Sequence, residues 1–298
     1  MSLRIRFYVS IDSSGQMKER VLSVAKSLRD GARAFGDEVK FVHNGDFSTP
    51  GEDVDVACCW GIIGNSSEIV SAYLTAGKRV LMFDKALIRR LGNERQGHFR
   101  VGIDGPSPIK YLMRTQKSWE RWESHRIEMK PRQMLEKRGT IVFCGSSQKY
   151  CDFYGLGDAN DYAEGLFNQV RDKLCKADLI YRPKPSWPGF RQIQGTKHSG
   201  PTQNLLQLLK SAHVLITHGS AAAIEAIVSG VPAITLGPCA AHPVAGHSIA
   251  ENIMDPFFVS DEARWQWACQ LAWCQFTADE LRSGEAWQFL KGELEATA

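Results

Sequence analysis

The sequence of 298 residues lacks several features that would narrow its function at once. It has no uncharged apolar run of about 18 residues, and the apolar stretch near its start is interrupted by Arg4 and Arg6. We therefore expect neither a signal peptide nor a membrane span. Low-complexity tracts and repeats of about 20 to 50 residues are also missing, which disfavours solenoids and disordered linkers.

No sign of charge dominates the chain. The 36 lysines and arginines against 33 acidic residues give a formal net charge of only +3. The chain as a whole is therefore not a polycation that coats DNA or an anionic membrane, and any contact with nucleic acid must be local. Eight cysteines occur without a CxxC pair. Several stand in strand or helix patterns, where a reduced thiol behaves as a small hydrophobe, so we expect a reducing cytosol.

Short apolar runs alternate with helical patterns twice along the chain. The first series is RIRFYVS, VKFVH, VDVACCW and RVLMFD, and the second is GTIVFCG, DLIYRPKP, HVLITHGS and VPAITLG. This alternation predicts an α/β fold with two parallel sheets in series, each covered by helices. We expect domains at 1–137 and 138–260, with helices of residues 261–298 packing back across both. The apolar anchors of that last segment would be Trp265, Trp267, Trp273, Phe276, Trp287, Phe289 and Leu290.

The stretch THGSAAAIEAIVSGVPAITLG (217–237) places small residues between a predicted strand and a predicted helix. Open parallel sheets bind ligands beyond the carboxyl ends of their strands. Ser220 is a candidate N-cap, and the amides of residues 221–223 together with the helix dipole would suit a phosphate. Ile224, Ile227 and Val228 would face the core. Ala221, Glu225 and Ser229 would share another face, where the carboxylate could hold a ribose diol. The alternative is that Glu225 is a solvated helix residue.

Other strand ends carry residues that would complete such a site. Gly145 and Ser146 follow one strand, although an ordinary turn explains them equally well. Arg182 and Lys184 end another and would face a diphosphate, unless they are plain surface charge. His242 and His247 stand on a Gly/Pro-containing loop without an obvious third metal ligand. Because no DxD-like pair follows a strand either, we expect no metal.

Residues 217–237 resemble the nucleotide-sugar half of glycosyltransferases of the GT-B fold, and the resemblance extends over about 139–258. It implies two Rossmann-like domains facing a cleft, a nucleoside-diphosphate sugar of the UDP-glucose type as donor substrate, and no permanently bound cofactor or metal. Sugar-nucleotide 2-epimerases share the fold and a similar motif, but they are usually longer. The predicted donor contacts are Gly145, Ser146, Arg182, Lys184, His218, Gly219, Ser220, Ala221, Glu225 and His242.

An inverting transferase also needs a base for the acceptor hydroxyl, which we expect at a strand end of the N-terminal domain. Asp84 in RVLMFD is the first choice, followed by Asp12 and His98. A carboxylate at the end of a buried strand is well held and partly desolvated, which suits general-base work. The alternative is that Asp84 caps a helix starting near Ala86.

Basic side chains alternate with aromatic ones between residues 110 and 138, a pattern that suits a polyanion with stackable bases. Compact GT-B enzymes without a membrane helix resemble viral glycosyltransferases that modify hydroxymethylated pyrimidines in DNA, reached by base flipping in the host cytoplasm. The alternatives are a solvated helix face, an anionic capsule or lipopolysaccharide acceptor, an epimerase, and a non-catalytic nucleotide-binding protein. The predicted DNA contacts are Arg89, Arg90, Arg114, Lys117, Trp119, Arg121 and Trp122.

Overall fold

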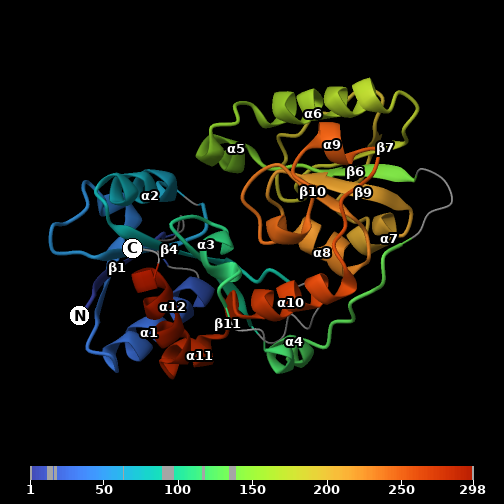
Figure 1. Cartoon of the computed structure of the whole chain (residues 1–298). Helices are drawn as coiled ribbons and strands as arrows, with labels where there is room; N and C mark the ends of the chain where they lie inside the picture. The colour runs from blue at the N-terminus through green and yellow to red at the C-terminus, as the bar shows by residue number, and fades with distance from the viewer. Residues whose placement is uncertain are drawn as a thin grey trace. The chain divides into compact units, whose positions relative to one another are not determined.

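A computed structural model of the chain describes residues 2–11, 16, 19–62, 64–88, 97–115, 118–133 and 139–296. The chain divides into two compact units, each with its own sheet (Figure 1). Unit 1 comprises Met1–Arg89, Asn93–Thr115 and Ala272–Ala298. Unit 2 comprises Arg90–Gly92 and Gln116–Leu271. Within the described ranges, no helix is both long and apolar enough to cross a lipid bilayer.

Unit 1 is built on a sheet of six strands in the order β11-β5-β4-β3-β1-β2. Strands β2, β1, β3 and β4 are parallel, whereas β5 pairs antiparallel with β4 and β11 pairs antiparallel with β5. Their inward-facing residues are almost entirely apolar, as the strand patterns predict. The strands are β1 (Arg4–Val9), β2 (Glu38–His43), β3 (Val56–Trp60), β4 (Arg79–Lys85), β5 (Phe99–Ile103) and β11 (Gln275–Phe276).

Helices from both ends of the chain cover the sheet of unit 1. Helix α1 (Glu19–Arg33) buries residues at helical spacing, among them Val21, Val24 and Leu28. It packs against α11 (Ala278–Arg282) and α12 (Glu285–Ala296), on the side of the sheet opposite α2 (Ser66–Thr75) in Figure 1. A capping box of Thr277 and Glu280 starts α11. The short helices are η1 (Asn44–Asp46) and α3 (Ile109–Leu112).

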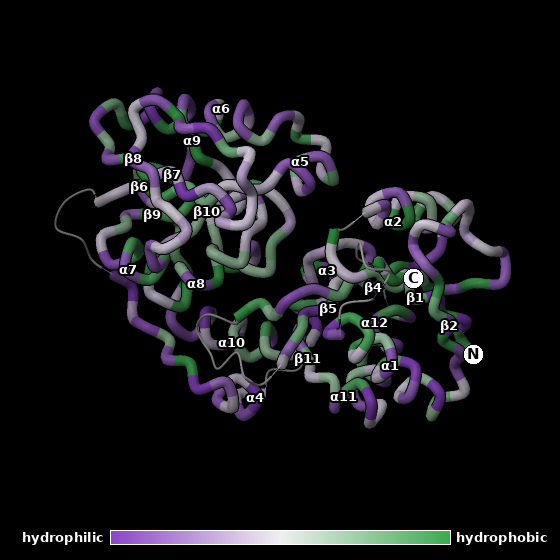
Figure 2. The backbone as a smooth tube through the Cα atoms, turned by 180° about the vertical axis from the view of Figure 1, so that it is seen from behind, coloured by the Kyte–Doolittle hydropathy of each residue, from purple (hydrophilic) through white to green (hydrophobic). Residues whose placement is uncertain are grey.

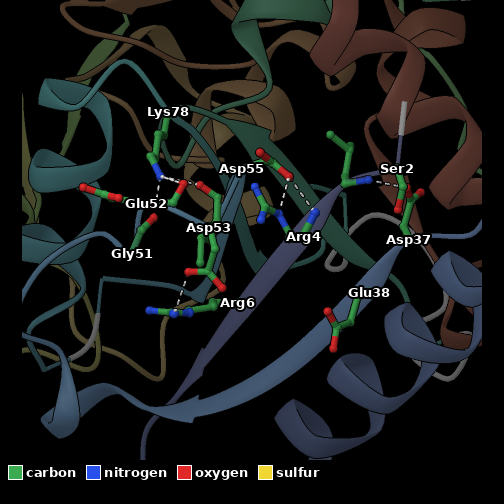
Figure 3. Close-up of polar contacts among 12 residues, drawn as sticks. Ser2, Arg4, Arg6, Asp37, Glu38, Gly51, Glu52, Asp53, Asp55 and Lys78 are labelled. Atoms are coloured by element: carbon green, nitrogen blue, oxygen red, sulfur yellow. Dashed lines mark hydrogen bonds and ion pairs between the residues drawn. The ribbon is translucent and has the colours of Figure 1, made fainter.

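The amino ends of the unit 1 strands are held by charged side chains, as Figure 3 shows. The ammonium of Lys78 donates to the carbonyl oxygens of Gly51, Glu52 and Val54 at 2.5, 3.2 and 2.7 Å. Arg6 forms an ion pair with Asp53 at 3.3 Å. Since buried carbonyls need donors, these contacts fix the turn before β3 against the start of β4.

Unit 2 is built on a five-stranded parallel sheet in the order β10-β9-β6-β7-β8. In the register, Cys144 pairs with both Arg182 and Thr217, and Thr217 pairs with Thr235. The carboxyl ends of four neighbouring strands therefore lie in one row. The strands are β6 (Thr140–Cys144), β7 (Leu179–Arg182), β8 (Lys197–His198), β9 (Ala212–Thr217) and β10 (Ala233–Thr235).

Helices cover both faces of this sheet. In Figure 1, α6 (Ala159–Lys173) and α9 (Ile249–Asn252) lie on one face, and α7 (Leu205–Leu209) and α8 (Ala222–Val228) on the other. Beneath α6, the rings of Phe143 and Tyr181 stack, and Phe167 of α6 meets both edge-on. Figure 2 shows hydrophilic and hydrophobic residues alternating along α6, as expected for a helix with one buried face. The other helices are α4 (Trp119–Ser124), α5 (Gln148–Tyr154), η3 (His242–Val244) and α10 (Asp261–Ala272).

The predicted α/β fold class with two sheets in series is confirmed, with two corrections. The first sheet is mixed, because β5 and β11 run antiparallel. The C-terminal segment is not wholly helical, since it supplies β11, and the expected anchor Trp265 is 41% exposed.

Residues 118–133 of the basic stretch belong to unit 2 and are bonded to its helices α8 and α10. The N–H of Lys130 donates to the carbonyl of Val228 at 2.9 Å. The guanidinium of Arg264, almost fully buried in α10, donates to the carbonyls of Lys130 and Ile227 at 2.8 and 3.0 Å.

Candidate functional site

The candidate donor site is the row of strand ends in unit 2. Parallel pairing of β10, β9, β6 and β7 places the segments that follow these strands at one edge of the sheet. Three glycines stand at this edge, Gly145 after β6, Gly219 after β9 and Gly237 after β10. Most of the predicted donor residues therefore come together here. Open parallel sheets bind their ligands at this position.

The turn after β9 is held by its own polar groups. The hydroxyl of Thr217 donates to the carbonyl of Cys144 at 2.9 Å, and Thr217 Oγ1 accepts from the N–H of Ser220 at 3.3 Å. The Oγ of Ser220 accepts from the N–H of Ala222 at 3.2 Å, but the N-cap of α8 is Ala221 rather than the predicted Ser220. The N–H of Ala223 donates to the Ser220 carbonyl at 3.2 Å.

These bonds correct the predicted anion site. The amides of Ala222 and Ala223 are satisfied inside the turn and do not face a ligand. Of the three predicted amides, that of Ala221 alone has no acceptor among the residues that the structure describes. Helix α8 is also short, with seven residues, so its dipole adds little to the attraction for phosphate.

Glu225 lies in the interior of unit 2. Its exposed fraction is 4%, and every residue of α8 is buried, including the predicted core residues Ile224, Ile227 and Val228. The alternative of a solvated helix residue is therefore wrong. A carboxylate is rarely buried in this way without a structural or binding role, because losing its hydration costs free energy.

His218 lies in a cage of tyrosine rings, formed by Tyr150 and Tyr154 of α5 and Tyr162 of α6. The ring centroids of these tyrosines are 5.8, 5.5 and 5.6 Å from that of His218. The hydroxyl of Tyr162 lies 2.8 Å from Nδ1 of His218. Burial lowers the pKa of His218, so its neutral form is favoured. Burial also raises the pKa of Tyr162 to about 12, so its hydroxyl keeps its proton.

Sequence analysis missed these tyrosines as part of the site. The signal that was present is the spacing of Tyr150 and Tyr154, four residues apart directly after the turn that follows β6. The side chains of this cage and of His218 leave no room for a Cβ at two of the strand-end glycines. A Cβ on Gly219 would lie 2.0 Å from the hydroxyl of Tyr150, and one on Gly237 would lie 2.1 Å from Nε2 of His218.

Arg182 is not plain surface charge, since its exposed fraction is 6%. Its Nη1 donates to the hydroxyl of Ser199 at 2.7 Å and to the carbonyl of Gly200 at 3.2 Å. Its own carbonyl accepts from the N–H of Gly145 at 2.9 Å. Arg182 therefore joins the end of β7 to the neighbouring strand ends, whereas Lys184 is exposed on the loop that follows.

His242 belongs to a loop that begins and ends at β10. The N–H of Gly237 donates to the His218 carbonyl at 2.8 Å, and Gly246 exchanges backbone bonds with Ala233 and Thr235 at 2.8 Å each. Nδ1 of His242 lies 3.0 Å from Oγ1 of Thr235. We call residues 237–247 the His242 loop. Across the described ranges, no group of three or more His, Cys, Asp or Glu side chains is arranged to hold a metal ion.

The predicted base Asp84 stands near the end of β4 in unit 1. Its carboxylate pairs with Arg100 at 2.8 Å and accepts from the N–H of Lys85 at 2.7 Å. Residues 86–88 are not helical, so the alternative of a helix cap at Ala86 does not hold. His98 lies at the same sheet edge, because Lys85 pairs with Phe99 in the register. The third candidate, Asp12, lies outside the described residues.

The predicted DNA contacts differ in their exposure and in their partners. Trp122 is fully buried, so its ring cannot stack on a base as predicted, whereas Trp119 is 55% exposed and Arg121 is half-buried. Arg114 of unit 1 forms an ion pair with Glu293 at 2.8 Å. Arg89, Arg90 and Lys117 lie outside the described residues.

At the level of sequence, no family model and no curated protein matches the chain. Among solved structures, the chain is similar to the beta Kdo 2,4 transferase KpsC of Thermosulfurimonas dismutans, with a TM-score of 0.53 and 13% sequence identity. The match covers 91% of this chain and 90% of that one. The fold resembles that of this transferase.

Two further likenesses are weaker. The beta Kdo 2,7 transferase KpsC of the same organism gives a TM-score of 0.44 at 14% identity, over 97% of this chain and 100% of that one. UDP-GlcNAc 2-epimerase from Neisseria meningitidis gives a TM-score of 0.33 at 10% identity, over 99% of this chain and 100% of that one. At 13% identity, the comparison with a TM-score of 0.53 shows a likeness of fold alone.

Proposed function

We propose that the protein is a glycosyltransferase that moves a sugar from a nucleotide-activated donor to a hydroxyl group of an anionic saccharide. The observation that carries the proposal is the row of strand ends in unit 2, where the segments that follow β6, β7, β9 and β10 meet at the ligand-binding edge of a parallel sheet. Its support is the likeness of the whole chain to a solved Kdo transferase.

In this proposal the donor lies along the row of strand ends. The exposed Lys184 approaches the phosphates and offsets the charge that develops on the leaving group. Glu225 accepts hydrogen bonds from the ribose hydroxyls, which a carboxylate does better than a neutral acceptor. Arg182 acts by holding the strand ends together, because its guanidinium is already engaged by Ser199 and Gly200.

An anionic saccharide is favoured over DNA as the acceptor for two reasons. The predicted DNA contacts are weakened by the burial of Trp122 and by the ion pair of Arg114 with Glu293. The solved transferase with the similar fold is named for a sugar, Kdo, and not for a nucleic acid. A 5-hydroxymethylpyrimidine in DNA remains the competing acceptor, and conversion of the donor alone remains the competing reaction.

The test is an incubation of the full chain with radiolabelled UDP-glucose, UDP-GlcNAc or nucleotide-activated Kdo. Each donor is offered with an acidic oligosaccharide ending in Kdo, with DNA containing 5-hydroxymethylcytosine, or without acceptor. The proposal expects label only in the oligosaccharide. Label in the modified DNA overturns the acceptor assignment, and epimerised free donor overturns transfer. If no donor is consumed or bound, the proposed function is wrong.

A further inference from the structure

His218 connects three parts of unit 2 that meet at the donor edge. Its ring packs against α5 and α6 through the tyrosine cage, and its Nδ1 meets the hydroxyl of Tyr162 at 2.8 Å. On the other side, Nε2 fills the place that a side chain on Gly237 would occupy. The ring therefore stands between a fixed helix and the first residue of the His242 loop.

Other contacts also hold the start of the His242 loop. The Nε1–H of Trp267 donates to the Ala240 carbonyl at 2.8 Å, and Sγ of Cys239 lies 3.5 Å from the Ser220 carbonyl oxygen. The N–H groups of Leu236 and Gly237 donate to the carbonyls of Thr217 and His218 at 3.0 and 2.8 Å. The far end is fixed by Gly246, which pairs with β10. The His218 ring, which lies against Gly237, is therefore one of the contacts that set the position of the loop relative to the turn at Gly219.

We propose that His218 is a positioning residue: Tyr162 orients its imidazole, and the imidazole sets the place of Gly237 and so of the loop that carries His242 to the donor. This inference rests on the proposed function of the strand-end row as a donor site. It replaces the expectation that His218 itself contacts the donor, because Nδ1 is engaged by Tyr162 and Nε2 lies against Gly237.

The proposal assigns one tautomer to His218. Tyr162 donates to Nδ1, and the proton of the neutral imidazole then resides on Nε2, next to Gly237. If Nδ1 were protonated, its hydrogen and the hydroxyl hydrogen of Tyr162 would both lie between the two groups. The hydroxyl hydrogen of Tyr162 would then have to turn away from the ring. The titratable groups whose rings face His218 are Tyr150 and Tyr154 from α5 and Tyr162 from α6.

The tautomer is measured directly by ¹⁵N NMR of the full chain with labelled histidine, with His218 assigned through a His218→Gln variant. We expect an unprotonated Nδ1 and a protonated Nε2 at pH 7.5, and loss of the Nδ1 hydrogen-bond shift in Tyr162→Phe. A proton on Nδ1, or a spectrum unchanged by Tyr162→Phe, overturns the proposal. This readout does not depend on any donor or activity.

The coupling between His218 and the loop is measured by a double-mutant cycle. Gly237→Ala forces a methyl group into Nε2, and overpacking of this kind should weaken binding of a nucleotide diphosphate, measured by calorimetry with UDP, by about tenfold or more. The backbone of Gly237 does not require glycine, because its φ is outside the positive range. Adding His218→Ala removes the obstacle, so the double variant should bind better than the product of the single effects predicts. Additive effects overturn the proposal.

The mild variant Tyr162→Phe should weaken UDP binding by about two- to tenfold, the range of one net hydrogen bond. The variant should also lose UDP affinity at a higher pH on acidification. The reason is that the neutral imidazole loses the hydrogen-bond donor that favours it, which raises the pKa of His218. The matched control is Tyr8→Phe in unit 1, which removes a hydroxyl bonded at the same 2.8 Å, to Tyr73. The control should leave UDP binding unchanged.

The two levels of the proposal fail in different ways. If wild-type protein binds no UDP, UDP-GlcNAc or activated Kdo, the donor site is wrong, whatever the tautomer of His218. The other outcome is that the wild-type protein binds a nucleotide and that Gly237→Ala, Tyr162→Phe and Tyr8→Phe all bind it with the wild-type affinity. In that case the donor site stands and the positioning role of His218 is wrong.

Discussion

The imidazole rings of His242 and His247 stack face to face, with centroids 3.7 Å apart and planes 7° apart. Nε2 of His247 also lies 2.9 Å from the carbonyl oxygen of His242. Burial, and then the charge of His247, lowers the pKa of His242, so its neutral form is favoured. Two imidazolium ions at this separation would repel strongly.

The stacked pair makes the His242 loop sensitive to acid. An unfolded histidine takes up a proton near pH 6.5, whereas folded His242 resists protonation to lower pH. Stability is therefore unaffected well above that pH and falls as the pH decreases below it. His247→Ala should raise the pKa of His242, which an NMR titration of the His242 ring protons measures. Removing the exposed His198, which stacks on Phe190 at the β8 edge, should leave that pKa unchanged.

Glu225 is predicted to hold the ribose of the donor. Glu225→Ala should weaken nucleotide binding by about tenfold or more, the value of one or two charge-assisted hydrogen bonds. Calorimetry with UDP measures the loss, and far-UV circular dichroism checks that the fold is kept. Glu251→Ala, on the exposed face of α9, is the matched control. An unchanged affinity in Glu225→Ala would defeat the ribose assignment.

Asp84 is predicted to take the proton of the acceptor hydroxyl. Asp84→Asn should lower kcat by a factor of about 100 to 10,000, the usual contribution of a general base. Nucleotide binding should persist, because the donor residues belong to unit 2. Arg100→Lys keeps a cation beside Asp84 and should cost far less. An equal loss of kcat in both variants would mean that the ion pair between Asp84 and Arg100, rather than a general base, supports activity.

Lys78 is predicted to stabilise unit 1 by satisfying three carbonyl groups. Lys78→Met keeps most of the aliphatic stem but removes the ammonium donor from the three carbonyls, of which that of Gly51 keeps the N–H of Val54 at 3.1 Å. The free energy of unfolding should fall by about 1–3 kcal/mol. Urea denaturation measures the change. Lys40→Met is the control, since Lys40 lies at the surface beside Glu38 and such charges contribute little. A change no larger than that of the control would contradict the prediction.

The sequence predicts well which strand ends of unit 2 meet at one edge, because parallel strands bring their carboxyl ends together whatever the details of packing. The patterns ending at Cys144, Arg182 and Thr217 were sufficient to bring Gly145, Arg182 and Gly219 to one edge. Burial is harder to foresee on short helices. Trp119 and Trp122 share six-residue α4, yet one is exposed and the other buried, because packing on the rest of unit 2 decides between them.

Other features depend on contacts distant in sequence. Strand β11 has two residues and lies among tryptophan-rich helices, so nothing local marks it as a strand, and only its pairing with β5 defines it. The tyrosine cage likewise joins His218 to residues 56 to 68 positions earlier in the chain. The internal bonds of the 217–223 turn were also missed, because short polar side chains compete with ligands for the same amides.

Strand β11 and helices α11 and α12 belong with the strands formed by the first residues of the chain. During synthesis on the ribosome, unit 1 therefore cannot be completed until these late residues emerge, whereas nearly all of unit 2 is one continuous stretch that precedes them. The second sheet can thus be folded while the edge of the first is still unpaired. Truncations that remove β11 would leave β5 as an open edge on the nascent chain, a template for aggregation.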